Sequence, residues 1–250
     1  MIKWSLLLLL LISRQLASQP LVHAHNDYQK KEPLTNALRN RVFSFEADVW
    51  LVNNELRVAH EARELSQAPT LDSLYLQPLV QLFKKYKGHV SRDIHYAPVL
   101  MIDIKMNGPE VLQYLQKKLA AYPRVFDRKV NPAAIQVVIS GERGNPLEWK
   151  NYPSLILFDG RPYENYDSSA LHKVAFISDT YLRYATADTF QTREKIKALA
   201  QQIHTLHKPL RLWAIPDSPS GWVELTGLGV DIINTDRVQE CRAFFYPKKD

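Results

Sequence analysis

A chain of 250 residues, of which 46% are hydrophobic and 23% charged, has the composition of an ordinary globular protein, which excludes collagen-like and low-complexity chains. The length suits a single α/β barrel domain better than two full domains. The formal net charge of +6 is compatible with an anionic ligand. The lysines and arginines are scattered without a basic stripe, so we expect no nucleic-acid partner. Cys241 is the only cysteine, which excludes a disulfide within the chain.

The N-terminal residues have the pattern of a signal peptide. Lys3 supplies a positive start, residues 4–12 form an apolar run, and small and polar residues follow up to Ser18. The apolar run is shorter than the ~20 residues that a membrane span needs, so no stable membrane anchor is expected. A buried N-terminal helix is the alternative. We therefore predict a signal peptide at 1–18, a barrel domain at 19–250, and a secreted or periplasmic protein.

Short apolar runs alternate with amphipathic stretches in the first half of the remaining chain. The runs VFSFEADV and VLMIDI are typical of buried strands, whereas residues 74–86 have the apolar spacing of a helix. In chain order, the elements predicted here are a strand at 21–23, a helix at 34–39, a strand at 42–49, a hairpin-like excursion at 55–59, a helix at 74–86, a strand at 99–104 and a helix at 111–121.

The same alternation continues in the second half. The predicted elements are strands at 135–140, 155–159 and 174–178, a helix at 192–207, a strand at 210–214, a helix at 222–228 and a strand at 231–234. Eight strands separated by helical segments indicate an α/β protein with a single (β/α)₈ TIM barrel. A doubly wound open sheet is the alternative, but no glycine-rich phosphate motif follows the first strand.

Acidic residues gather at the ends of two early strands, where barrels of this kind have their active sites. Glu46 and Asp48 are two residues apart and so face the same side of a strand, and Asp103 lies on another strand. Carboxylates in apolar strands are costly to bury unless a cation neutralises them. Oxygen ligands favour Mg²⁺ or Ca²⁺ over zinc, so we predict one such divalent cation. The alternative is that each carboxylate pairs with a lysine or an arginine.

Histidines accompany the acidic residues. His23 and His25 share one face at the end of the first strand, and His60 follows the hairpin-like excursion. Two imidazoles beside a metal could act as the general base and the general acid of a phosphoryl reaction. Each could instead be structural. Asn26 and Asp27 could orient a histidine or bind a substrate hydroxyl, or they could cap the turn that follows the strand.

Two further residues are candidates for substrate binding. Lys105 lies on the same face as Asp103, so it could pair with that carboxylate or hold a phosphate oxygen. Trp213 lies within a predicted strand and could line the pocket or belong to the barrel core.

The segments HAHNDY, FEADVWL, RVAHE and LMIDIK resemble the PLC-like phosphodiesterase superfamily, which includes glycerophosphodiester phosphodiesterases and spider-venom phospholipase D enzymes. The opening HAHNDY with EADVW is most similar to the branch of altered-inheritance-of-mitochondria protein 6-like proteins. The ordered pattern covers residues 21–105, and LRLWAIPD and VDIINTDR resemble the last two strands of that superfamily.

The resemblance implies a barrel with one divalent cation and two catalytic histidines. It implies metal ligands at Glu46, Asp48 and Asp103, catalytic histidines at His23 and His60, and a phosphate contact at Lys105.

Two departures from the superfamily pattern bear on the substrate. The first histidine of glycerophosphodiesterases is usually followed by Arg-Gly, whereas Ala24 and His25 follow it here. The third ligand is usually Glu, whereas this chain has Asp103.

The predicted function is hydrolysis of a phosphodiester, such as a small glycerophosphodiester or a phospholipid head group. A zinc-dependent amidohydrolase-like enzyme is one alternative, but it needs histidines at the fifth and sixth strand ends, and LILFDG and VAFISD contain none. A catalytically inactive secreted binding protein is the other alternative.

Overall fold

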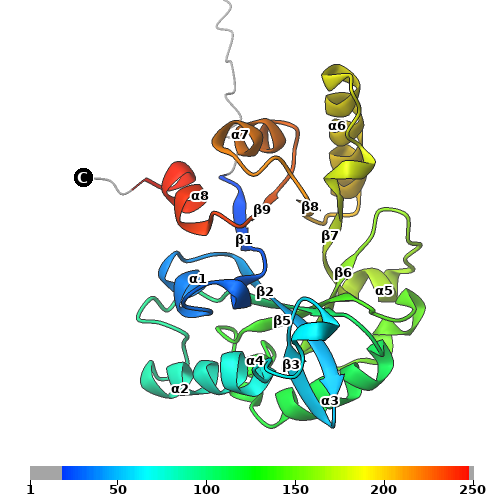
Figure 1. Cartoon of the computed structure of the whole chain (residues 1–250). Coiled ribbons are helices and arrows are strands. Elements are labelled where there is room, and N and C mark those ends of the chain that lie inside the picture. The colour runs from blue at the N-terminus through cyan, green and yellow to red at the C-terminus, as the bar shows by residue number, and fades with distance from the viewer. Residues whose placement is uncertain (1–18, 248–250) are drawn as a thin grey trace, which may run out of the picture.

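Eight parallel strands close into a barrel at the centre of the protein (Figure 1). The computed structural model describes residues 19–247. β1 (Leu21–Ala24) pairs in parallel with both β2 (Ser44–Val52) and β9 (Ile232–Thr235), so the sheet closes on itself. The predicted TIM barrel is confirmed, and the open-sheet alternative is wrong. The other barrel strands are β4 (Val99–Ile104), β5 (Gln136–Gly141), β6 (Ile156–Gly160), β7 (Val174–Thr180) and β8 (Leu210–Trp213).

The hairpin-like excursion after the second strand is also present. β3 (Glu55–Val58) pairs antiparallel with the far end of β2 and lies outside the cycle of parallel strands. The short helices η1 (Asp27–Gln29) and η2 (Ala62–Glu64) follow β1 and β3 respectively. These segments stand at the ends of the first two barrel strands, beside the predicted acidic cluster.

Helices follow the barrel strands and surround them in Figure 1. The five helices predicted from the sequence are present, within a few residues at each end. α4, α5 and α8 were not predicted from the sequence, because their apolar residues show no clear helical period over so few turns. The α-helices are α1 (Thr35–Arg39), α2 (Gln77–Lys85), α3 (Gly108–Ala120), α4 (Pro123–Phe126), α5 (Ser168–Lys173), α6 (Thr189–Thr205), α7 (Pro219–Gly227) and α8 (Val238–Phe245).

The inward-facing side chains of the strands form an apolar layer and a polar layer. Because side chains alternate along a strand, the inward set continues every second residue. Met101 belongs to the apolar layer, and the next inward residue of the same strand is Asp103. The polar layer therefore lies toward the C-terminal ends of the strands, where active sites of these barrels lie. The apolar layer contains Val99, Met101, Val138, Phe176 and Ile232.

The outward-facing side chains pack against the helices and form the larger hydrophobic core. α6 buries Ile196, Leu199 and Ile203 against the barrel. Trp149 stacks on Phe158 of β6 with a ring-centroid separation of 4.3 Å. This outer core fixes the strand positions and so leaves the polar layer in a defined place.

The predicted signal peptide at residues 1–18 lies outside the described residues. Within residues 19–247, every helix is too short or too polar to cross a membrane.

Candidate active site

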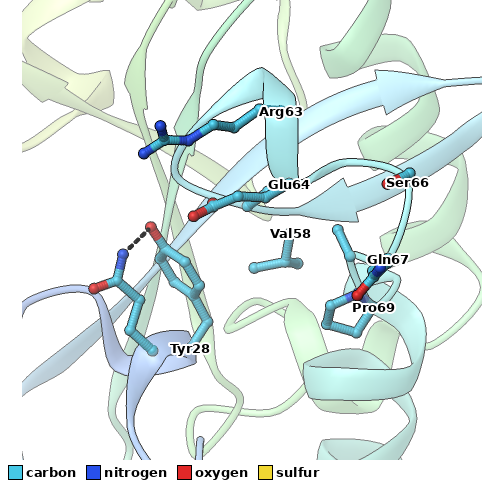
Figure 2. A pocket seen from close by; sticks show the side chains of 10 residues that line it. Tyr28, Val58, Arg63, Glu64, Ser66, Gln67 and Pro69 are labelled. Carbon is cyan, nitrogen blue, oxygen red and sulfur yellow. Dashed lines mark hydrogen bonds between the residues drawn. The ribbon is translucent and has the colours of Figure 1, made fainter.

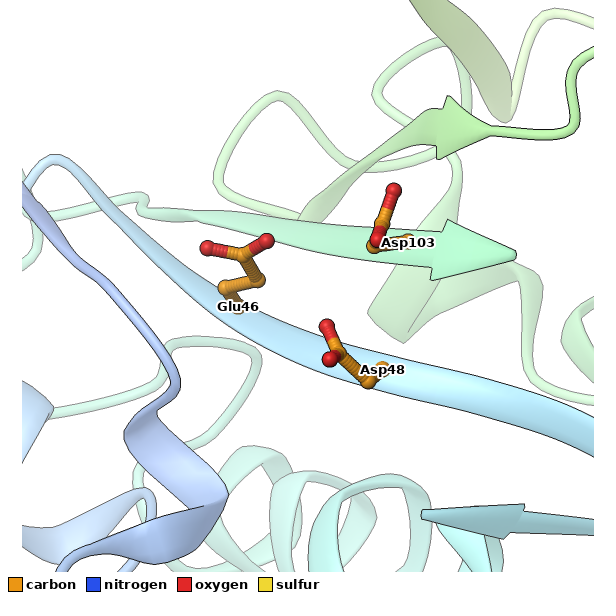
Figure 3. A group of neighbouring side chains, drawn as sticks. All are labelled: Glu46, Asp48 and Asp103. Atoms are coloured by element: carbon orange, nitrogen blue, oxygen red, sulfur yellow. The ribbon is translucent and has the colours of Figure 1, made fainter. Parts of the chain in front are cut away.

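Three carboxylates meet where β2 and β4 run side by side (Figure 3). Asp48 and Asp103 are direct partners across the two strands, and Glu46 lies one inward position earlier on β2. One oxygen from each of the three lies within 4.8 Å of the others. Glu46 and Asp48 are buried, and Asp103 is partly buried. The structure thus brings together all three residues that the sequence predicts as metal ligands.

The hydrogen bonds of Asp48 leave one of its oxygens without a partner. Oδ2 accepts from the Tyr28 hydroxyl at 2.9 Å, from His60 Nδ1 at 2.9 Å and from Lys105 Nζ at 2.8 Å. Oδ1 is buried and has no hydrogen-bond partner among the described residues. A buried carboxylate oxygen without a donor is unfavourable, so this oxygen fits a group that supplies positive charge.

Lys105 neutralises part of the cluster. Its ammonium group contacts Asp103 Oδ2 as well as Asp48, and these two carboxylates raise the pKa of Lys105 even though its burial acts to lower it. Burial raises the pKa of the Asp103 carboxyl, an effect that Lys105 opposes and Glu46 reinforces. Lys105, together with Arg211 at 3.7 Å from Glu46, still leaves three carboxylates with fewer cations, and an all-oxygen donor set with remaining negative charge fits a hard divalent cation.

His23 is enclosed in the barrel and has both ring nitrogens occupied. Nε2 donates to Glu46 Oε2 at 2.9 Å, and Nδ1 accepts from the Ser44 hydroxyl at 2.7 Å. Burial, and next the nearby Arg211 charge, hold the pKa of His23 well below its usual value. The side chain is fully buried, which favours a neutral imidazole, and its contact with Oε2 fixes the position of the Glu46 carboxylate.

His25 stands at the barrel mouth and forms a pair with Asp236, which follows β9. The His25 Nδ1 group lies 3.3 Å from Asp236 Oδ1, and Lys30 Nζ contacts the same oxygen at 3.0 Å. Burial acts to lower the pKa of His25, but the hydrogen bond to Asp236 and the charge of Glu46 outweigh it and raise that pKa. Its Nε2 makes no hydrogen bond to a described residue, and 32% of the side chain is exposed.

His60 reaches the cluster from the loop after β3. Nδ1 donates to Asp48 Oδ2 at 2.9 Å, and 49% of the side chain is exposed. The backbone N–H of His60 is held by Glu64 Oε2 at 2.9 Å. Like His25, it has its Nε2 free of hydrogen bonds to the described residues. The cluster therefore has two accessible imidazoles, each fixed through Nδ1 by a carboxylate.

Asn26 and Asp27 have different surroundings. Asn26 adopts a left-handed backbone with φ of 45°, and its Oδ1 accepts weakly from Tyr28 at 3.4 Å. Asp27 is buried, and its Oδ2 accepts from the Leu34 backbone and the Tyr75 hydroxyl at 2.6 and 2.9 Å. Asp27 therefore contacts no histidine and instead holds the chain that follows η1.

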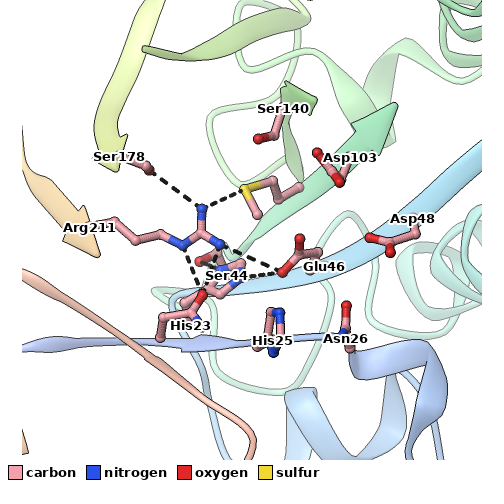
Figure 4. Close-up of polar contacts among 12 residues, drawn as sticks. His23, His25, Asn26, Ser44, Glu46, Asp48, Asp103, Ser140, Ser178 and Arg211 are labelled. Atoms are coloured by element: carbon pink, nitrogen blue, oxygen red, sulfur yellow. Dashed lines mark hydrogen bonds and ion pairs between the residues drawn. The ribbon is translucent and has the colours of Figure 1, made fainter. Parts of the chain in front are cut away.

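Arg211 was missed by the sequence analysis. It is buried at the inward face of β8, with Nη2 3.7 Å from Glu46 Oε2 and 2.8 Å from Asn234 Oδ1 (Figure 4). Its Nη1 also lies 3.6 Å from Met101 Sδ, which joins the polar layer to the apolar one. An arginine two residues before Trp213 on a strand is the signal that could have identified it.

A second arginine adds to this positive side of the barrel. Arg161 Nη1 contacts the fully buried Asp159 at 2.8 Å, and Asp159 also accepts from the Ser178 hydroxyl. Burial acts to raise the pKa of Asp159, but Arg161 and then Arg211 outweigh it and lower that pKa. The Trp213 ring lies beneath both guanidinium groups, at 5.0 Å from Arg161 and 6.0 Å from Arg211.

The barrel mouth has carboxylates on β2 and β4 and guanidinium groups on β8 and after β6. This division of charge suits a cation on one side and an anionic group beside it. The fifth and sixth barrel strands, β6 and β7, carry Asp159 and Ser178 rather than histidines, which disfavours the amidohydrolase-like alternative.

Comparisons with known proteins give a family and a fold. Residues 12–144 match the family described as the AIM6-like phosphodiesterase domain. The altered inheritance of mitochondria protein 6 of Eremothecium gossypii is 27% identical over 268 residues, covering 89% of this chain and 69% of that protein. Its homolog in Arthroderma benhamiae is 26% identical over 90% of this chain and 83% of its own length. The predicted resemblance to this branch of the PLC-like phosphodiesterases is confirmed.

Solved structures extend the comparison to the whole barrel. The crystal structure of a glycerophosphodiester phosphodiesterase from Parabacteroides distasonis superposes with a TM-score of 0.59 over 91% of this chain and 97% of that one. The sequence identity is 15%, so this similarity shows the fold alone.

The prediction of a secreted or periplasmic protein is wrong by these comparisons. The relatives are named for the inheritance of mitochondria, which does not fit an exported protein. A lysine followed by a short leucine-rich run is a weak signal, because the same pattern suits apolar N-terminal segments that have other roles.

Proposed function

Because the chain belongs to the family of AIM6-like phosphodiesterase domains, we propose that it hydrolyses a phosphodiester at the barrel mouth with one divalent cation, Mg²⁺ or Ca²⁺. Glu46, Asp48 and Asp103 would hold the cation. The observation that carries the proposal is the buried Oδ1 of Asp48, which has no hydrogen-bond partner among the described residues and lies in this carboxylate cluster beside two accessible histidines.

When bound, a divalent cation draws electron density from a non-bridging phosphate oxygen and offsets the charge of the transition state. The chain's own residues supply the rest. His23 keeps the Glu46 carboxylate in place through its 2.9 Å hydrogen bond. Lys105 and the arginine side of the barrel attract the phosphate, since they carry positive charge next to the cluster.

Proton transfer is proposed for His25 and His60. Both are partly exposed and have an Nε2 without a hydrogen bond to residues 19–247, whereas His23 is buried and has both ring nitrogens hydrogen-bonded. One of them takes a proton from the attacking group, and the other gives a proton to the leaving oxygen. A neutral, enclosed imidazole such as His23 cannot exchange protons with a substrate, so its proposed role is to position Glu46.

The proposed substrate is a small glycerophosphodiester or the head group of a phospholipid. A phosphodiester carries one negative charge, which suits the cationic side of the mouth formed by Arg161 and Arg211. Trp213, beneath these two guanidinium groups, is placed to contact the substrate beside the phosphate.

The test is turnover of bis(p-nitrophenyl) phosphate by histidine variants in the presence of Mg²⁺ or Ca²⁺. His25→Ala and His60→Ala should each lower kcat by roughly 10²–10⁴-fold, the usual contribution of general acid–base catalysis. Both side chains are partly exposed, so the fold should be kept. His23→Ala should mainly raise the cation concentration needed for half-maximal rate, because it frees Glu46.

His204→Ala is the matched control. His204 also pairs with a carboxylate, Asp231 at 2.8 Å, but on the surface of α6. Its turnover should equal that of the wild type. If His25→Ala and His60→Ala kept wild-type rates while folded, the proposed roles would be untenable.

A further inference from the structure

A cleft of about 680 Å³ adjoins the acidic cluster between η1 and the loop after β3 (Figure 2). Tyr28 and Gln29 form one wall, and the η2 region with Ser66 and Gln67 forms the other. Its volume is within the range of small-molecule sites, so it can hold a sugar-sized group.

Two contacts tie the cleft to the candidate catalytic residues. The Tyr28 hydroxyl, in one wall, donates to Asp48 Oδ2 at 2.9 Å. In the other wall, the Glu64 carboxylate accepts from the backbone of His60 and of Glu61 at 2.9 and 3.1 Å. A group bound in the cleft therefore lies on the side of the cluster that carries His60.

The lining of the cleft combines apolar side chains, such as Val58 and Pro69, with polar groups that are mostly uncharged. Gln29, Ser66 and Gln67 offer amide and hydroxyl groups, and Ser66 and Gln67 are exposed. The charged groups of the lining are already engaged, because Glu64 caps η2 and Arg63 pairs with Glu61 at 2.7 Å. Such a surface suits neutral hydroxyl groups, which both donate and accept hydrogen bonds.

Other kinds of alcohol fit this lining less well. A quaternary ammonium group is usually recognised by several aromatic faces, whereas Tyr28 is the single aromatic residue that the described part of the chain contributes to the lining. An acyl chain needs a continuous apolar surface, which the amides and the hydroxyl interrupt.

We propose that this cleft binds the alcohol half of the phosphodiester and that this alcohol is polyhydroxylated and sugar-sized, an inference that rests on the proposed function. In the reaction, a water oxygen forms a bond to phosphorus and the bond from phosphorus to the alcohol oxygen breaks. His25 takes the water proton, and His60, beside the cleft, gives its proton to the departing alcohol. The products are a phosphomonoester and the free polyhydroxylated alcohol.

The experiment compares two substrates with one double variant, Ser66→Ala with Gln67→Ala. Both residues are exposed, so the variant should fold. With glycerophosphoinositol, KM should rise about 3- to 10-fold, since a net hydrogen bond contributes a factor of this order. With bis(p-nitrophenyl) phosphate, which offers no hydroxyl groups, kcat/KM should stay within twofold of the wild type. Gln201→Ala, an exposed glutamine of α6, should change neither value.

The possible outcomes distinguish failure of the proposed alcohol binding in the cleft from failure of the proposed phosphodiester hydrolysis. Equal kinetics of the double variant and the wild type on glycerophosphoinositol would overturn the cleft assignment and leave phosphodiester hydrolysis standing. A wild type that hydrolyses bis(p-nitrophenyl) phosphate but not glycerophosphoinositol would also overturn the cleft assignment and leave phosphodiester hydrolysis standing. A wild type that hydrolyses neither substrate with Mg²⁺ or Ca²⁺ overturns both proposals.

Discussion

Two histidines of the HAHNDY segment, two residues apart, have opposite electrostatic surroundings. His23 is enclosed beside Glu46 and has a lowered pKa, chiefly because of burial. His25 has a raised pKa because Asp236 and Glu46 outweigh its burial. The difference comes from a residue more than 200 positions away in the sequence, since Asp236 follows the last barrel strand.

Replacing Asp236 with Asn should therefore lower the pKa of His25. Asp236→Asn removes both the charge and the strong acceptor that raise this pKa. The measurement is an NMR titration of the imidazole protons in both proteins. Asp231→Asn, which alters the partner of His204, is the control and should leave the His25 titration unchanged.

Stability should change with pH in the same variant. The pKa of His25 is raised above its ordinary value of 6.5, so its pairing stabilises the fold below this pH and is lost as pH rises through the folded-state pKa. Asp236→Asn should thus destabilise the protein more at about pH 5.5 than at about pH 8.5. An unchanged His25 pKa and a pH-independent loss would show that the pair has no such coupling.

For single residues, the sequence predicted the acidic side chains of the site better than the positively charged ones. Glu46, Asp48 and Asp103 were predictable because i, i+2 spacing within apolar strands fixes their direction. Arg211 was missed because its i, i+2 neighbour on the strand, Trp213, is uncharged, so the pair did not mark a second charged face. The distinction between His23 and His25 could not be predicted, because it depends on long-range contacts with Ser44 and Asp236.

At the scale of elements, the end of β5 fixes how closely the chain approaches the acidic cluster. Gly141 has φ of +69°, and a Cβ there would overlap the Ile104 carbonyl oxygen and lie 2.6 Å from Asp103 Oδ1. Both approaches are closer than real Cβ atoms tolerate. Glycine is therefore required for its backbone conformation and also for the space beside Asp103.

Gly141→Ala should destabilise the protein more than Gly144→Ala. Gly144 has a similar φ of +71°, but the Cβ of an alanine there would meet nothing within 4 Å, so it reports the conformational cost alone. That cost is about 1 kcal/mol for an L-residue in this region. We expect Gly141→Ala to exceed it by at least about 1 kcal/mol, through the clash with Ile104. Urea unfolding measures both, and equal losses would contradict the close approach.

The strands were the predictable elements, and the short helices were not. Runs such as VLMIDI are apolar on both faces, because one face points into the barrel interior and the other packs against the surrounding helices. Such strands are therefore recognisable from the sequence alone. α4 and α5, of four and six residues, are held by packing and by the cap from Asp167 rather than by a periodic pattern.

For the whole molecule, closure of the barrel puts early and late parts of the chain into one site. β1 lies between β2 and β9, which brings His25 to Asp236 and Arg211 to within 3.7 Å of Glu46. Closure of the barrel was predictable from the sequence, because eight strands separated by helices in a chain of this length match a (β/α)₈ barrel. The predicted location of the protein was wrong, since it rested on a short apolar run and on nothing in the fold.

The central claim is that Glu46, Asp48 and Asp103 hold a divalent cation on which phosphodiester hydrolysis depends. The most direct measurement is the rate of bis(p-nitrophenyl) phosphate turnover against Mg²⁺ or Ca²⁺ concentration, starting from EDTA-treated protein, for the wild type and Glu46→Gln. The wild type should have no rate above background in EDTA and should recover it in a saturable manner. Glu46→Gln should need at least about tenfold more cation, because it loses one charged ligand. A full rate in EDTA, or the same cation dependence in both proteins, would contradict the account.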